Sequence, residues 1–381
     1  MKVVLAPDSF KGSLSALEVV EAMREGILNV DPDAKIEPAP MADGGEGTTD
    51  NVIQAFNGRR EYVEISGPMG KPVTAKYGIF KENKCVIEVA ESSGLTLLKP
   101  DELDPLHTTT FGLGQLIKDA LNKGCRTFVI GLGGSATNDG GAGMAAALGY
   151  RLLDAAGNDI PHCGGALNRL SRIAADDVDE RIFESDFLIA CDVKNPLCGE
   201  NGASVVFGPQ KGADAEAVKL LDDNLKHFAE IIYRDLGKQV ADIPGAGAAG
   251  GLGAGTVAFL DGKLAEGVSI IAELSELEQK IRGADLVFTG EGKCDSQTLN
   301  GKTPYGVAAI AKRNGVPAYI IAGTVGNGIE PLYDNGVNKI YGIKTEEMTV
   351  EYSQANARTL IIKTAARAYS EFVEETGRCG K

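Results

Sequence analysis

A short apolar segment that runs into a polar, glycine-containing loop and then into a helix start recurs along this chain. In the first copy, the apolar segment Lys2–Ala6 leads into Ala6–Ala16, with the sequence APDSFKGSLSA. Ser15 and Glu18 have the spacing of a capping box, which predicts a helix start beside them. In open α/β sheets such loops lie at the carboxyl ends of strands, where anionic ligands bind. The pattern predicts an α/β protein with ligand-binding loops; the alternative is a well-capped turn without a ligand.

Glycine is frequent in this chain and is clustered rather than dispersed. There are 49 glycines among 381 residues, against a usual share of roughly 7%. Glycine clusters between strands and helices indicate close backbone approach or unusual backbone angles, and we interpret them as ligand loops. The clusters lie at Asp43–Gly47, Gly131–Gly143, Gly245–Gly255 and Gly290–Gly301.

The alternation of strands and helices divides the chain into parts. Strand and helix patterns alternate from the start of the chain to about Ile65 and again from Asp285 onward, as in a doubly wound sheet. The middle lacks that alternation, and the chain is too long for one ordinary core. We predict a discontinuous α/β domain, residues 1–65 and 284–381, interrupted by an inserted α/β domain, residues 66–283, with a ligand site in the cleft between them.

Composition argues against several classes of protein. A formal net charge of −15 and a pI near 4.8 argue against nucleic acid or an anionic membrane as partner, because both require a basic surface. No apolar run reaches the length of a membrane span, and Asp8 and Lys11 interrupt the N-terminal apolar stretch before a signal peptide could form. Seven cysteines without C-x-x-C spacing indicate reduced thiols in a cytoplasmic protein. With three widely separated histidines, acid–base chemistry falls to Asp, Glu or Lys.

The segment Phe128–Gly143, FVIGLGGSATNDGGAG, contains a formal match to a dinucleotide fingerprint. Gly131–Ala136 has the G-x-G-x-x-A spacing and follows a predicted strand, which is the best argument for an NAD-dependent hydroxy-acid oxidoreductase. However, Gly140, Gly141 and Gly143 fall where the next helix should begin, and each glycine costs about 1 kcal/mol in a helix interior. A longer phosphate-binding loop explains these glycines better.

In that longer loop, two hydroxyl side chains are placed to donate hydrogen bonds to phosphate oxygens, those of Ser135 and Thr137. Asn138 and Asp139 follow directly and are candidates to hold a cation. The alternative is a purely structural glycine turn, which we weigh as the weaker interpretation because loops so often carry function.

Two further glycine motifs resemble nucleotide loops only by letter. Gly245–Gly250 matches G-x-G-x-x-G, but Pro244 precedes it and no apolar strand leads into it, so we interpret it as a close-approach loop or a hinge. Gly301–Thr303 copies the end of a P-loop, but Pro304 follows at once. Thr303 and Pro304 instead predict the N-cap and first residue of a helix.

Acidic and basic side chains follow the ends of two more predicted strands. Thr289–Asp295, TGEGKCD, places Glu291, Lys293 and Asp295 directly after an apolar strand. Cys191–Pro196 likewise delivers Asp192, with Lys194 beside it, to the end of a strand. A carboxylate beside a lysine is often only a surface ion pair, but at a strand terminus we favour a catalytic or phosphate-binding role.

Two other loops add charged candidates. Met41–Thr49, MADGGEGTT, carries Asp43 and Glu46 on a glycine turn that enters a helix. They are either simple partners of the helix dipole or ligands of a metal or of substrate hydroxyls. Lys211 lies on the tight loop Gly208–Gly212 and supplies another cation.

Glycine-rich loops with acids, lysines and hydroxyls suit phosphoryl transfer, which needs positioning and cationic groups more than covalent chemistry. Six strings closely resemble the type I glycerate kinases of bacteria, and the resemblance spans nearly the whole chain: APDSFKGSLSA, MADGGEGT, GLGGSATNDGGAG, CDVKNPLCGENGAS, FGPQKGA and TGEGKCDSQTLNGKTP. The resemblance implies an ATP-dependent kinase, assisted by Mg²⁺, that converts D-glycerate to 2-phospho-D-glycerate. It also implies two α/β domains, one discontinuous and Rossmann-like, with the active site between them.

Within that resemblance, loop position suggests a role for each candidate. Ser9 and Lys11 are candidates for the glycerate carboxylate, and Asp192, with Asp295 as its rival, for the group that deprotonates the attacking hydroxyl. The catalytic set is Asp192, Lys11, Lys293 and Asp295. The substrate-binding set is Asp8, Ser9, Lys11, Asp43, Glu46 and Lys194. The nucleotide-binding set is Gly133, Gly134, Ser135, Thr137, Asn138, Lys211 and Gly290, and the Mg²⁺ set is Asp43, Asp139 and Asp295.

Three alternatives stay open at this point. The first is the NAD-dependent oxidoreductase suggested by Gly131–Ala136. The second is a GHMP-type kinase, because GLGGSA resembles the loop of that class over six residues. The third is a binding module without turnover. Sequence also leaves open whether the 2- or the 3-hydroxyl is attacked, and whether the protein is a monomer or a homo-oligomer.

Overall fold

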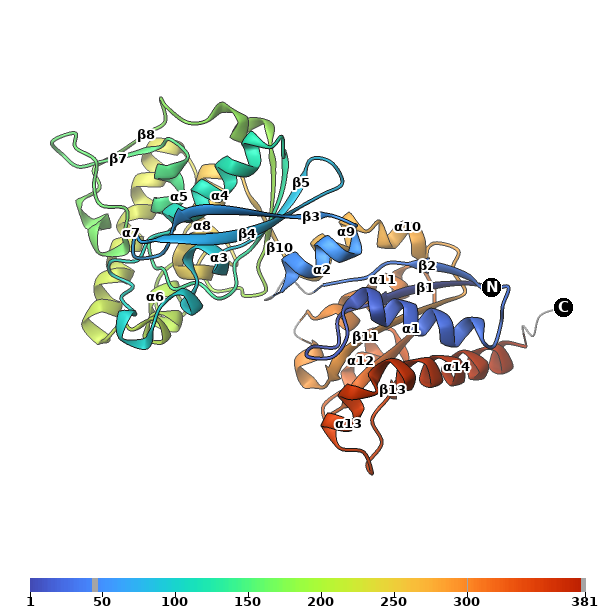
Figure 1. Cartoon of the computed structure of the whole chain (residues 1–381). Coiled ribbons are helices and arrows are strands. Elements are labelled where there is room, and N and C mark those ends of the chain that lie inside the picture. Colours follow the sequence, from blue (N-terminus) through green and yellow to red (C-terminus); the bar gives the residue numbers. More distant parts are fainter. Residues whose placement is uncertain (43–46, 300, 378–381) are drawn as a thin grey trace. The chain divides into compact units, whose positions relative to one another are not determined.

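The computed structural model describes residues 1–42, 47–299 and 301–377. The chain divides into two compact units (Figure 1). Unit 1 is Met1–Asp43 with Val268–Lys381, and unit 2 is the continuous stretch Gly44–Gly267. Each unit has its own β-sheet and helices, so the predicted α/β class is confirmed.

Within the described residues, the sheet of unit 1 has five strands in the order β13-β12-β11-β1-β2, all parallel. The strands are β1 (Lys2–Pro7), β2 (Lys35–Pro38), β11 (Leu286–Cys294), β12 (Ala318–Val325) and β13 (Val337–Gly342). The chain winds outward from β1 to β2 on one side and from β11 to β13 on the other. The order therefore reverses between β1 and β11, and ligands of such sheets bind outside the carboxyl ends of the strands at that reversal.

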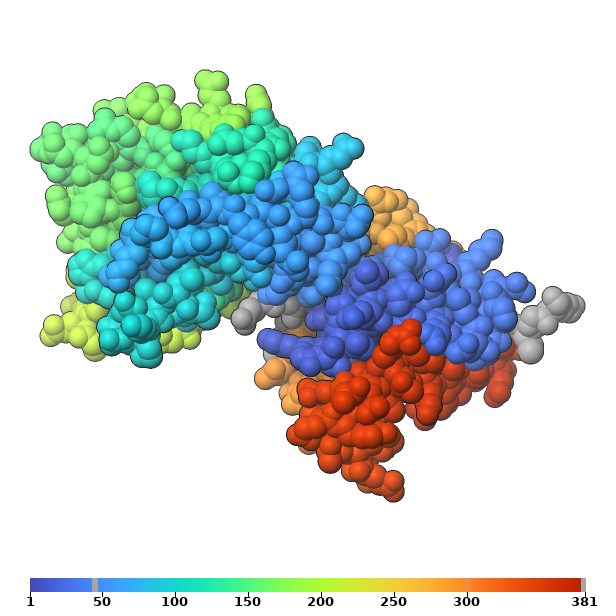
Figure 2. Space-filling view, viewed as in Figure 1, coloured from blue at the N-terminus to red at the C-terminus, as the bar shows by residue number. Residues whose placement is uncertain are grey.

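The helices of unit 1 join its two chain segments. They are α1 (Ala16–Leu28), α9 (Gly267–Leu274), α10 (Leu277–Ile281), α11 (Thr303–Arg313), α12 (Glu330–Asp334), α13 (Val350–Ala355) and α14 (Ala357–Thr376). The Ser15–Glu18 capping box starts α1 as predicted. Helix α1 packs against α14, so the blue N-terminal and red C-terminal residues lie side by side in Figure 2. Both helices contribute to one apolar core with Val3 and Leu5, whereas α11 packs on β11 and β12.

Unit 2 holds a mixed sheet of six strands within the described residues, in the order β10-β9-β6-β5-β4-β3. The strands are β3 (Arg59–Ser66), β4 (Pro72–Phe80), β5 (Lys84–Glu88), β6 (Thr127–Gly131), β9 (Asp186–Ala190) and β10 (Lys263–Ala265). Strands β5, β6, β9 and β10 are parallel, while β3 and β4 are antiparallel. A separate pair, β7 (Arg151–Leu153) and β8 (Arg172–Ala174), is antiparallel. The carboxyl ends of β5, β6, β9 and β10 therefore share one edge.

The helices of unit 2 are α2 (Thr48–Ala55), α3 (Ala90–Ser93), α4 (Phe111–Asn122), α5 (Ala142–Ala147), α6 (Ala203–Phe207), α7 (Ala215–Leu236) and α8 (Ala248–Leu260). Short 3₁₀ turns complete the two units: η1 (Leu95–Leu97), η2 (Pro100–Glu102), η3 (Gly164–Arg169), η4 (Glu180–Glu184), η5 (Pro209–Lys211) and η6 (Ser296–Leu299). Among these described elements, none is a helix with the length and apolar character needed to span a membrane.

The expected domain boundaries differ from the observed division at both ends. We placed residues 44–65 with the first domain, but β3 pairs antiparallel with β4, so this stretch belongs to unit 2. We placed residues 268–283 in the inserted domain, but α9 and α10 fall in unit 1 beyond Gly267. Alternation of strand and helix alone does not show which sheet a strand joins. The glycine-rich stretch 245–255, which we interpreted as a close-approach loop or a hinge, overlaps the start of α8, where Ala249, Gly250 and Gly251 have non-helical, left-handed backbone angles.

Candidate functional site

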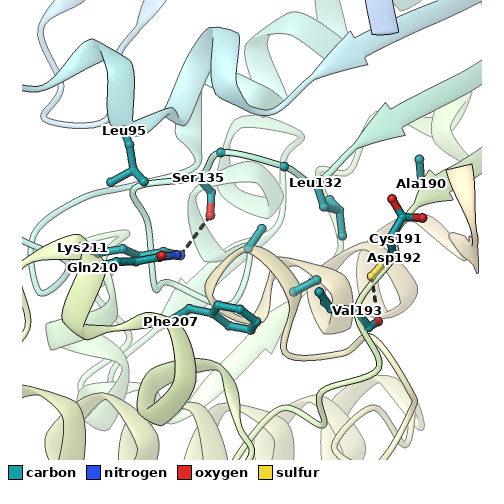
Figure 3. Close-up of a pocket in the computed structure, with 14 residues that line it drawn as sticks. Leu95, Leu132, Ser135, Ala190, Cys191, Asp192, Val193, Phe207, Gln210 and Lys211 are labelled. Atoms are coloured by element: carbon teal, nitrogen blue, oxygen red, sulfur yellow. Dashed lines mark hydrogen bonds between the residues drawn. The ribbon is translucent and has the colours of Figure 1, made fainter. Parts of the chain in front are cut away.

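A pocket of about 210 Å³ lies in unit 2, at the carboxyl ends of β6 and β9 (Figure 3). Apolar side chains from Leu95, Leu132 and Phe207 form much of its wall. In the view of Figure 3, Lys211 and Asp192 lie at opposite sides of the pocket, with Ser135 between them. The full lining is Leu95, Leu132, Gly133, Gly134, Ser135, Ala190, Cys191, Asp192, Val193, Phe207, Gln210, Lys211, Ala248 and Ala249. The pocket thus combines apolar surface, backbone, one lysine and one carboxylate.

The loop after β6 is longer than a dinucleotide fingerprint allows. Strand β6 ends at Gly131, and α5 begins only at Ala142. The residue before α5, Gly141, has a φ of 83°, a left-handed conformation that favours glycine. In a dinucleotide-binding fold the helix would begin within the glycine motif itself. The prediction of a longer loop is therefore confirmed, and the fingerprint reading of Gly131–Ala136 is not supported.

Lys211 is a buried cation held by neutral oxygen atoms. Its side chain is 1% exposed, and its Nζ donates hydrogen bonds to Ser135 Oγ at 3.0 Å and to the Thr137 carbonyl at 2.7 Å. It forms no ion pair within the described part of the chain. Burial lowers the pKa of Lys211 to about 7, against the opposing attraction of Asp139. When protonated, a lysine so placed has its charge available for an anionic ligand, because no carboxylate of the described residues forms an ion pair with it.

Asp139, which we predicted as a cation ligand, has a structural role in the fold. Its fully buried carboxylate accepts hydrogen bonds from the Thr110 N–H and hydroxyl, both at 2.8 Å. The N–H groups of Gly141 and Gly143, each at 3.1 Å, complete the set. Burial raises the pKa of Asp139, while these hydrogen bonds lower it. With four donors around it, the carboxylate fixes the start of α5, and its oxygens are already engaged by the protein.

Thr137 and Asn138 are fully buried and do not line the pocket. The Thr137 carbonyl accepts from Lys211, and Asn138 Oδ1 accepts from the Ser204 hydroxyl at 3.1 Å. Within the described residues, Thr137 Oγ1 and Asn138 Nδ2 have no hydrogen-bond partner. Gly250, at a φ of 69°, lies so close that a Cβ there would be 1.9 Å from the Thr137 carbonyl oxygen. Thr137 and Asn138 therefore support the loop from inside the fold rather than from the pocket. The glycine stretch at the start of α8 is a close-approach segment, which is one of the two interpretations we gave it.

Asp192 and Lys194 follow β9 on exposed backbone. Asp192 is the one carboxylate among the described residues that line the pocket. Its Oδ1 accepts a hydrogen bond at 3.1 Å from the N–H of Gly267, the first residue of α9. Lys194 is exposed and does not line the pocket. Of this pair, the structure therefore brings only Asp192 to the glycine loop.

A second cluster lies in unit 1, where β1 and β11 end side by side. Asp8 directly follows β1 and is 8% exposed. One of its oxygens accepts from the Ser9 N–H at 2.6 Å and from the Ser9 hydroxyl at 3.3 Å. The other accepts from the hydroxyl of Thr303, the first residue of α11, at 2.7 Å. Thr303 thus binds Asp8 rather than capping α11, since the N-cap is Lys302. Lys11, in the same loop, is exposed.

Glu291, which our candidate sets omit, is a buried carboxylate in this cluster. It is 8% exposed and lies in the central strand β11 between two glycines. Its Oε1 accepts from the Thr298 hydroxyl at 2.5 Å, and Lys302 Nζ lies 3.8 Å from its Oε2. Burial raises the pKa of Glu291 to about 7; Thr298 and Lys302 oppose this shift, and Asp8 and Asp295 add to it. We predicted that Thr289–Asp295 follows the strand, but β11 continues to Cys294, so Glu291 and Lys293 lie inside it.

Lys293 and Asp295, both predicted as catalytic, pair with one another. Lys293 Nζ lies 2.8 Å from Asp295 Oδ2, and the Lys293 side chain is 67% exposed. The Gln297 N–H donates to Asp295 Oδ1 at 2.9 Å. Lys293 and then this N–H lower the pKa of Asp295. Among the described residues no group of three acids, histidines or cysteines is arranged to hold a metal.

Three other candidates need separate mention. Gly290 is a strand residue whose carbonyl accepts from the Asp8 N–H, and a Cβ there would lie 2.3 Å from the Ile321 carbonyl oxygen. Packing between β11 and β12 thus accounts for this glycine without a nucleotide, and it belongs to unit 1, not to the unit of the glycine loop. Asp43 and Glu46 lie outside the described residues.

The predicted residues therefore fall into two groups. Gly133, Gly134, Ser135, Asp192 and Lys211 line one pocket in unit 2. Asp8, Ser9, Lys293 and Asp295 lie near the ends of β1 and β11 in unit 1. Sequence reasoning singled out Glu291 but left it out of the candidate sets, assigned Thr303 to a helix cap, and missed the apolar pocket wall, because these depend on which elements pack together.

Comparisons with known proteins agree in their result. A profile described as the glycerate kinase family matches residues 3–372. A glycerate kinase of Halalkalibacterium halodurans is 47% identical over 364 residues, covering 95% of this chain and 96% of the relative. A glycerate 2-kinase of Escherichia coli K12 is 46% identical over 92% of each chain. The crystal structure of a protein provisionally assigned as glycerate kinase 2, from Salmonella typhimurium LT2, matches with a TM-score of 0.89 at 44% identity, covering 99% of both chains.

Proposed function

This chain belongs to the glycerate kinase family, and from that premise we propose that it transfers the terminal phosphoryl group of ATP to D-glycerate. The proposed acceptor is the 2-hydroxyl, giving 2-phospho-D-glycerate and ADP, because the E. coli relative carries the name glycerate 2-kinase. A kinase is the enzyme class that the resemblance in the sequence implied. An NAD-dependent oxidoreductase loses its support with the long loop before α5.

The observation that carries the proposal is the buried Lys211 beneath the Gly133–Ser135 loop, which forms no ion pair with the described residues. Phosphate oxygens take hydrogen bonds from backbone N–H groups and from cations, and a buried cation attracts them more strongly than an exposed one. We propose that Lys211 contacts the nucleotide phosphates in place of, or alongside, the Ser135 hydroxyl that it now holds at 3.0 Å. The apolar wall with Leu95, Leu132 and Phe207 suits the flat face of a nucleotide base.

For the acceptor, we propose the loop that follows β1. Glycerate is a small anion with two hydroxyl groups, so its site needs a cation for the carboxylate and an acceptor for a hydroxyl. Lys11 is an exposed cation on this loop, and Asp8 with Ser9 offers polar atoms beside it. The roles of Lys194, Asp43 and Glu46 in substrate binding stay predictions.

Mg²⁺ is the proposed metal, as in phosphoryl transfer generally. Asp139 does not suit it because four donors already occupy its carboxylate. Asp295 is committed to Lys293. Mg²⁺ bound with a nucleotide takes most of its ligands from phosphate and water and only one or two from carboxylates, so Asp192 in the pocket suffices to hold it. When bound, the metal would neutralise charge on the phosphates.

A turnover assay with Mg-ATP and D-glycerate tests the proposal. The product is coupled through enolase, with and without added phosphoglycerate mutase. Turnover without mutase is the expected result and identifies 2-phosphoglycerate. Turnover only with mutase would mean attack by the 3-hydroxyl. An absence of ATP consumption in both arms, from protein that is folded by circular dichroism, would contradict the proposal. We place this activity in the cytoplasm, in line with the seven cysteines that lack C-x-x-C spacing.

A further inference from the structure

We propose that Glu291, rather than Asp192, is the general base that takes the proton from the attacking glycerate hydroxyl. This inference rests on the proposed function and adds to it the identity of the base. It is carried by the place of Glu291 in the sheet, by the one oxygen of its carboxylate that accepts no hydrogen bond from the described residues, and by the contrast with other buried acids.

The first observation is the position of Glu291 in unit 1. In the parallel register of β1 and β11, Pro7 lies opposite Gly290. Asp8 and Glu291 are the next residues of the two strands, so they flank the point where the strand order of the sheet reverses. That reversal opens a crevice at the carboxyl ends of the strands and is the usual ligand position in open α/β sheets. The Ser9–Lys11 loop, our proposed glycerate site, leaves the sheet at the same point: a Cβ at Gly292 would be 3.3 Å from Lys11 N.

The second observation is the hydrogen bonding of the carboxylate. Oε1 accepts from the Thr298 hydroxyl at 2.5 Å. Oε2 accepts no hydrogen bond within the described part of the chain, since Lys302 Nζ at 3.8 Å is too distant for one. Burying a carboxylate with an unsatisfied oxygen is costly. A substrate hydroxyl that donates to Oε2 would supply the missing hydrogen bond.

Two other buried carboxylates, Glu88 and Asp139, show what a structural acid looks like. Both oxygens of Glu88 accept from backbone N–H groups at the start of α2, Thr49 at 2.7 Å and Gly47 at 3.1 Å. Asp139 accepts four hydrogen bonds at the start of α5. In each case both carboxylate oxygens accept hydrogen bonds from the protein. In Glu291, only Oε1 accepts a hydrogen bond within the described residues.

The electrostatic setting suits a base that works at neutral pH. Burial raises the pKa of Glu291 to about 7, with contributions from Asp8 on β1 and from Asp295 at the end of β11. Thr298 and Lys302 oppose the shift, and the Cys294 thiol beside it is itself raised in pKa to about 11 and stays neutral. A base with a pKa near the working pH combines adequate basicity with a large ionised fraction. The rival Asp295 is a weaker base, because Lys293 lowers its pKa.

The step is then a simple in-line displacement. The glycerate hydroxyl oxygen forms a bond to the terminal phosphorus of ATP as its proton passes to Glu291 Oε2. The bond from that phosphorus to the bridging oxygen breaks, and ADP leaves with the electron pair. Glu291 returns its proton to water after the product departs, so the cycle balances.

The test compares Glu291→Gln with the parent enzyme, first in the turnover assay and then over pH 5.5–9. Glutamine has nearly the same size, and its amide oxygen still accepts from Thr298. We expect kcat to fall by about 10²–10⁴-fold, the usual contribution of a general base, while KM for glycerate changes only a few-fold. In the parent, kcat should fall tenfold per pH unit below about pH 7, and that acidic limb should vanish in the variant. Glu278→Gln, an exposed acid of the same unit, is the matched control and should keep the limb.

A second variant keeps the inference falsifiable if Glu291→Gln fails to fold. Thr298→Val removes the hydrogen bond that lowers the pKa of Glu291, so the acidic limb should move to higher pH, which a merely structural role would not produce. Asp192→Asn should retain the acidic limb whatever its kcat. The inference is overturned if Glu291→Gln keeps kcat within threefold, if the limb persists in it, or if the limb is lost in Asp192→Asn. A parent enzyme without turnover on glycerate would instead contradict the proposed function.

Discussion

The pocket of unit 2 and the carboxylate cluster of unit 1 occupy equivalent places in two different sheets. Each lies at the carboxyl ends of parallel strands, and each contains a buried ionisable side chain to which we assign a role. In unit 2 that side chain is Lys211, held by two neutral oxygens. In unit 1 it is Glu291, held by a hydroxyl at one oxygen. Two similar scaffolds thus offer opposite charges.

The difference shows that the position in the fold selects where a ligand binds, while local packing selects which ligand binds. Lys211 is aligned with a glycine loop whose N–H groups add to its positive potential, a setting for phosphate. Glu291 and Asp8 make the reversal point of unit 1 negative, a setting for groups that donate a proton. Burial shifts the two pKa values in opposite directions, lowering that of Lys211 and raising that of Glu291, so that each reaches about 7.

Removing the buried cation of unit 2 is the most direct test of the difference between the two units. We expect Lys211→Met to lower kcat/KM for ATP by about 10²–10³-fold, the effect of losing one preorganised charge next to a transferring group. The loss should appear in ATP binding by calorimetry, while KM for glycerate changes little. Lys219→Met, an exposed lysine on α7, is the control and should match the parent. An ATP affinity within threefold of the parent would show that the pocket binds something else.

A methyl group at Gly250 tests whether the unit 2 pocket depends on close backbone approach. Gly250 and Gly237 have nearly the same φ, 69° and 71°, but only Gly250 has neighbours within reach of a Cβ, the nearest the Thr137 carbonyl oxygen at 1.9 Å. Gly237→Ala should therefore cost only the strain of a left-handed residue, about 1–2 kcal/mol. Gly250→Ala should cost about 1–3 kcal/mol more from overpacking and should also weaken ATP binding. Equal urea midpoints for the two variants would contradict this.

The pH dependence of binding and of turnover should separate the two groups. Lys211 is charged below a pKa of about 7 and neutral above it, so nucleotide affinity should decline as pH rises, by at most about tenfold per pH unit. Glu291 is neutral below about pH 7, so kcat should decline as pH falls. Titration calorimetry with ADP at pH 6, 7 and 8 measures the first effect without any chemistry. In Lys211→Met the ADP affinity should be flat over that range; a persistent slope would assign it to another group.

The smallest predicted effect compares helix caps in the two units. Ser15 caps α1 in unit 1, and Asp214 caps α7 in unit 2 by accepting from the Ala217 N–H at 2.8 Å. Ser15→Ala and Asp214→Ala should each lower the free energy of unfolding by about 1 kcal/mol, with kcat unchanged at 25 °C. Urea unfolding followed by hydrogen exchange should show the loss in the helix's own unit. Equal loss of protection in both units would mean that they unfold together.

The sequence predicted local elements well and assembly less well. The Ser15–Glu18 box, the late start of α5 and the ends of β6 and β9 follow from local spacing in the sequence, whereas β11 runs on to Cys294, through residues that we expected to follow the strand. It could not tell that β3 joins the sheet of unit 2, because pairing partners are non-local. Leu17 illustrates the same limit, since it has helical spacing with the core residues of α1 but is 39% exposed.

For the candidate site too, the sequence predicted local features better than the contacts between distant residues. Glycine loops and strand ends located Lys211, Ser135 and Asp192, because those signals lie within a few residues. Asp139 was assigned to a metal because its four hydrogen-bond donors come partly from Thr110, which lies 29 positions earlier in the sequence. Glu291 was passed over for Asp295, since only the folded chain shows which of the two acids is buried and which is ion-paired.

The division of unit 1 between the two ends of the chain also sets the order in which the protein can be completed during synthesis. Unit 2 is continuous, so all of its strands have emerged from the ribosome once Gly267 has left it. Strand β1 is made first but pairs with β11, whose first residue is Leu286. The apolar residues of β1 therefore stay without their β11 partner during most of translation. Unit 1 is completed last, when α14 has been synthesised and packs against α1. The newborn chain holds one finished unit and one exposed strand, a state that chaperones recognise.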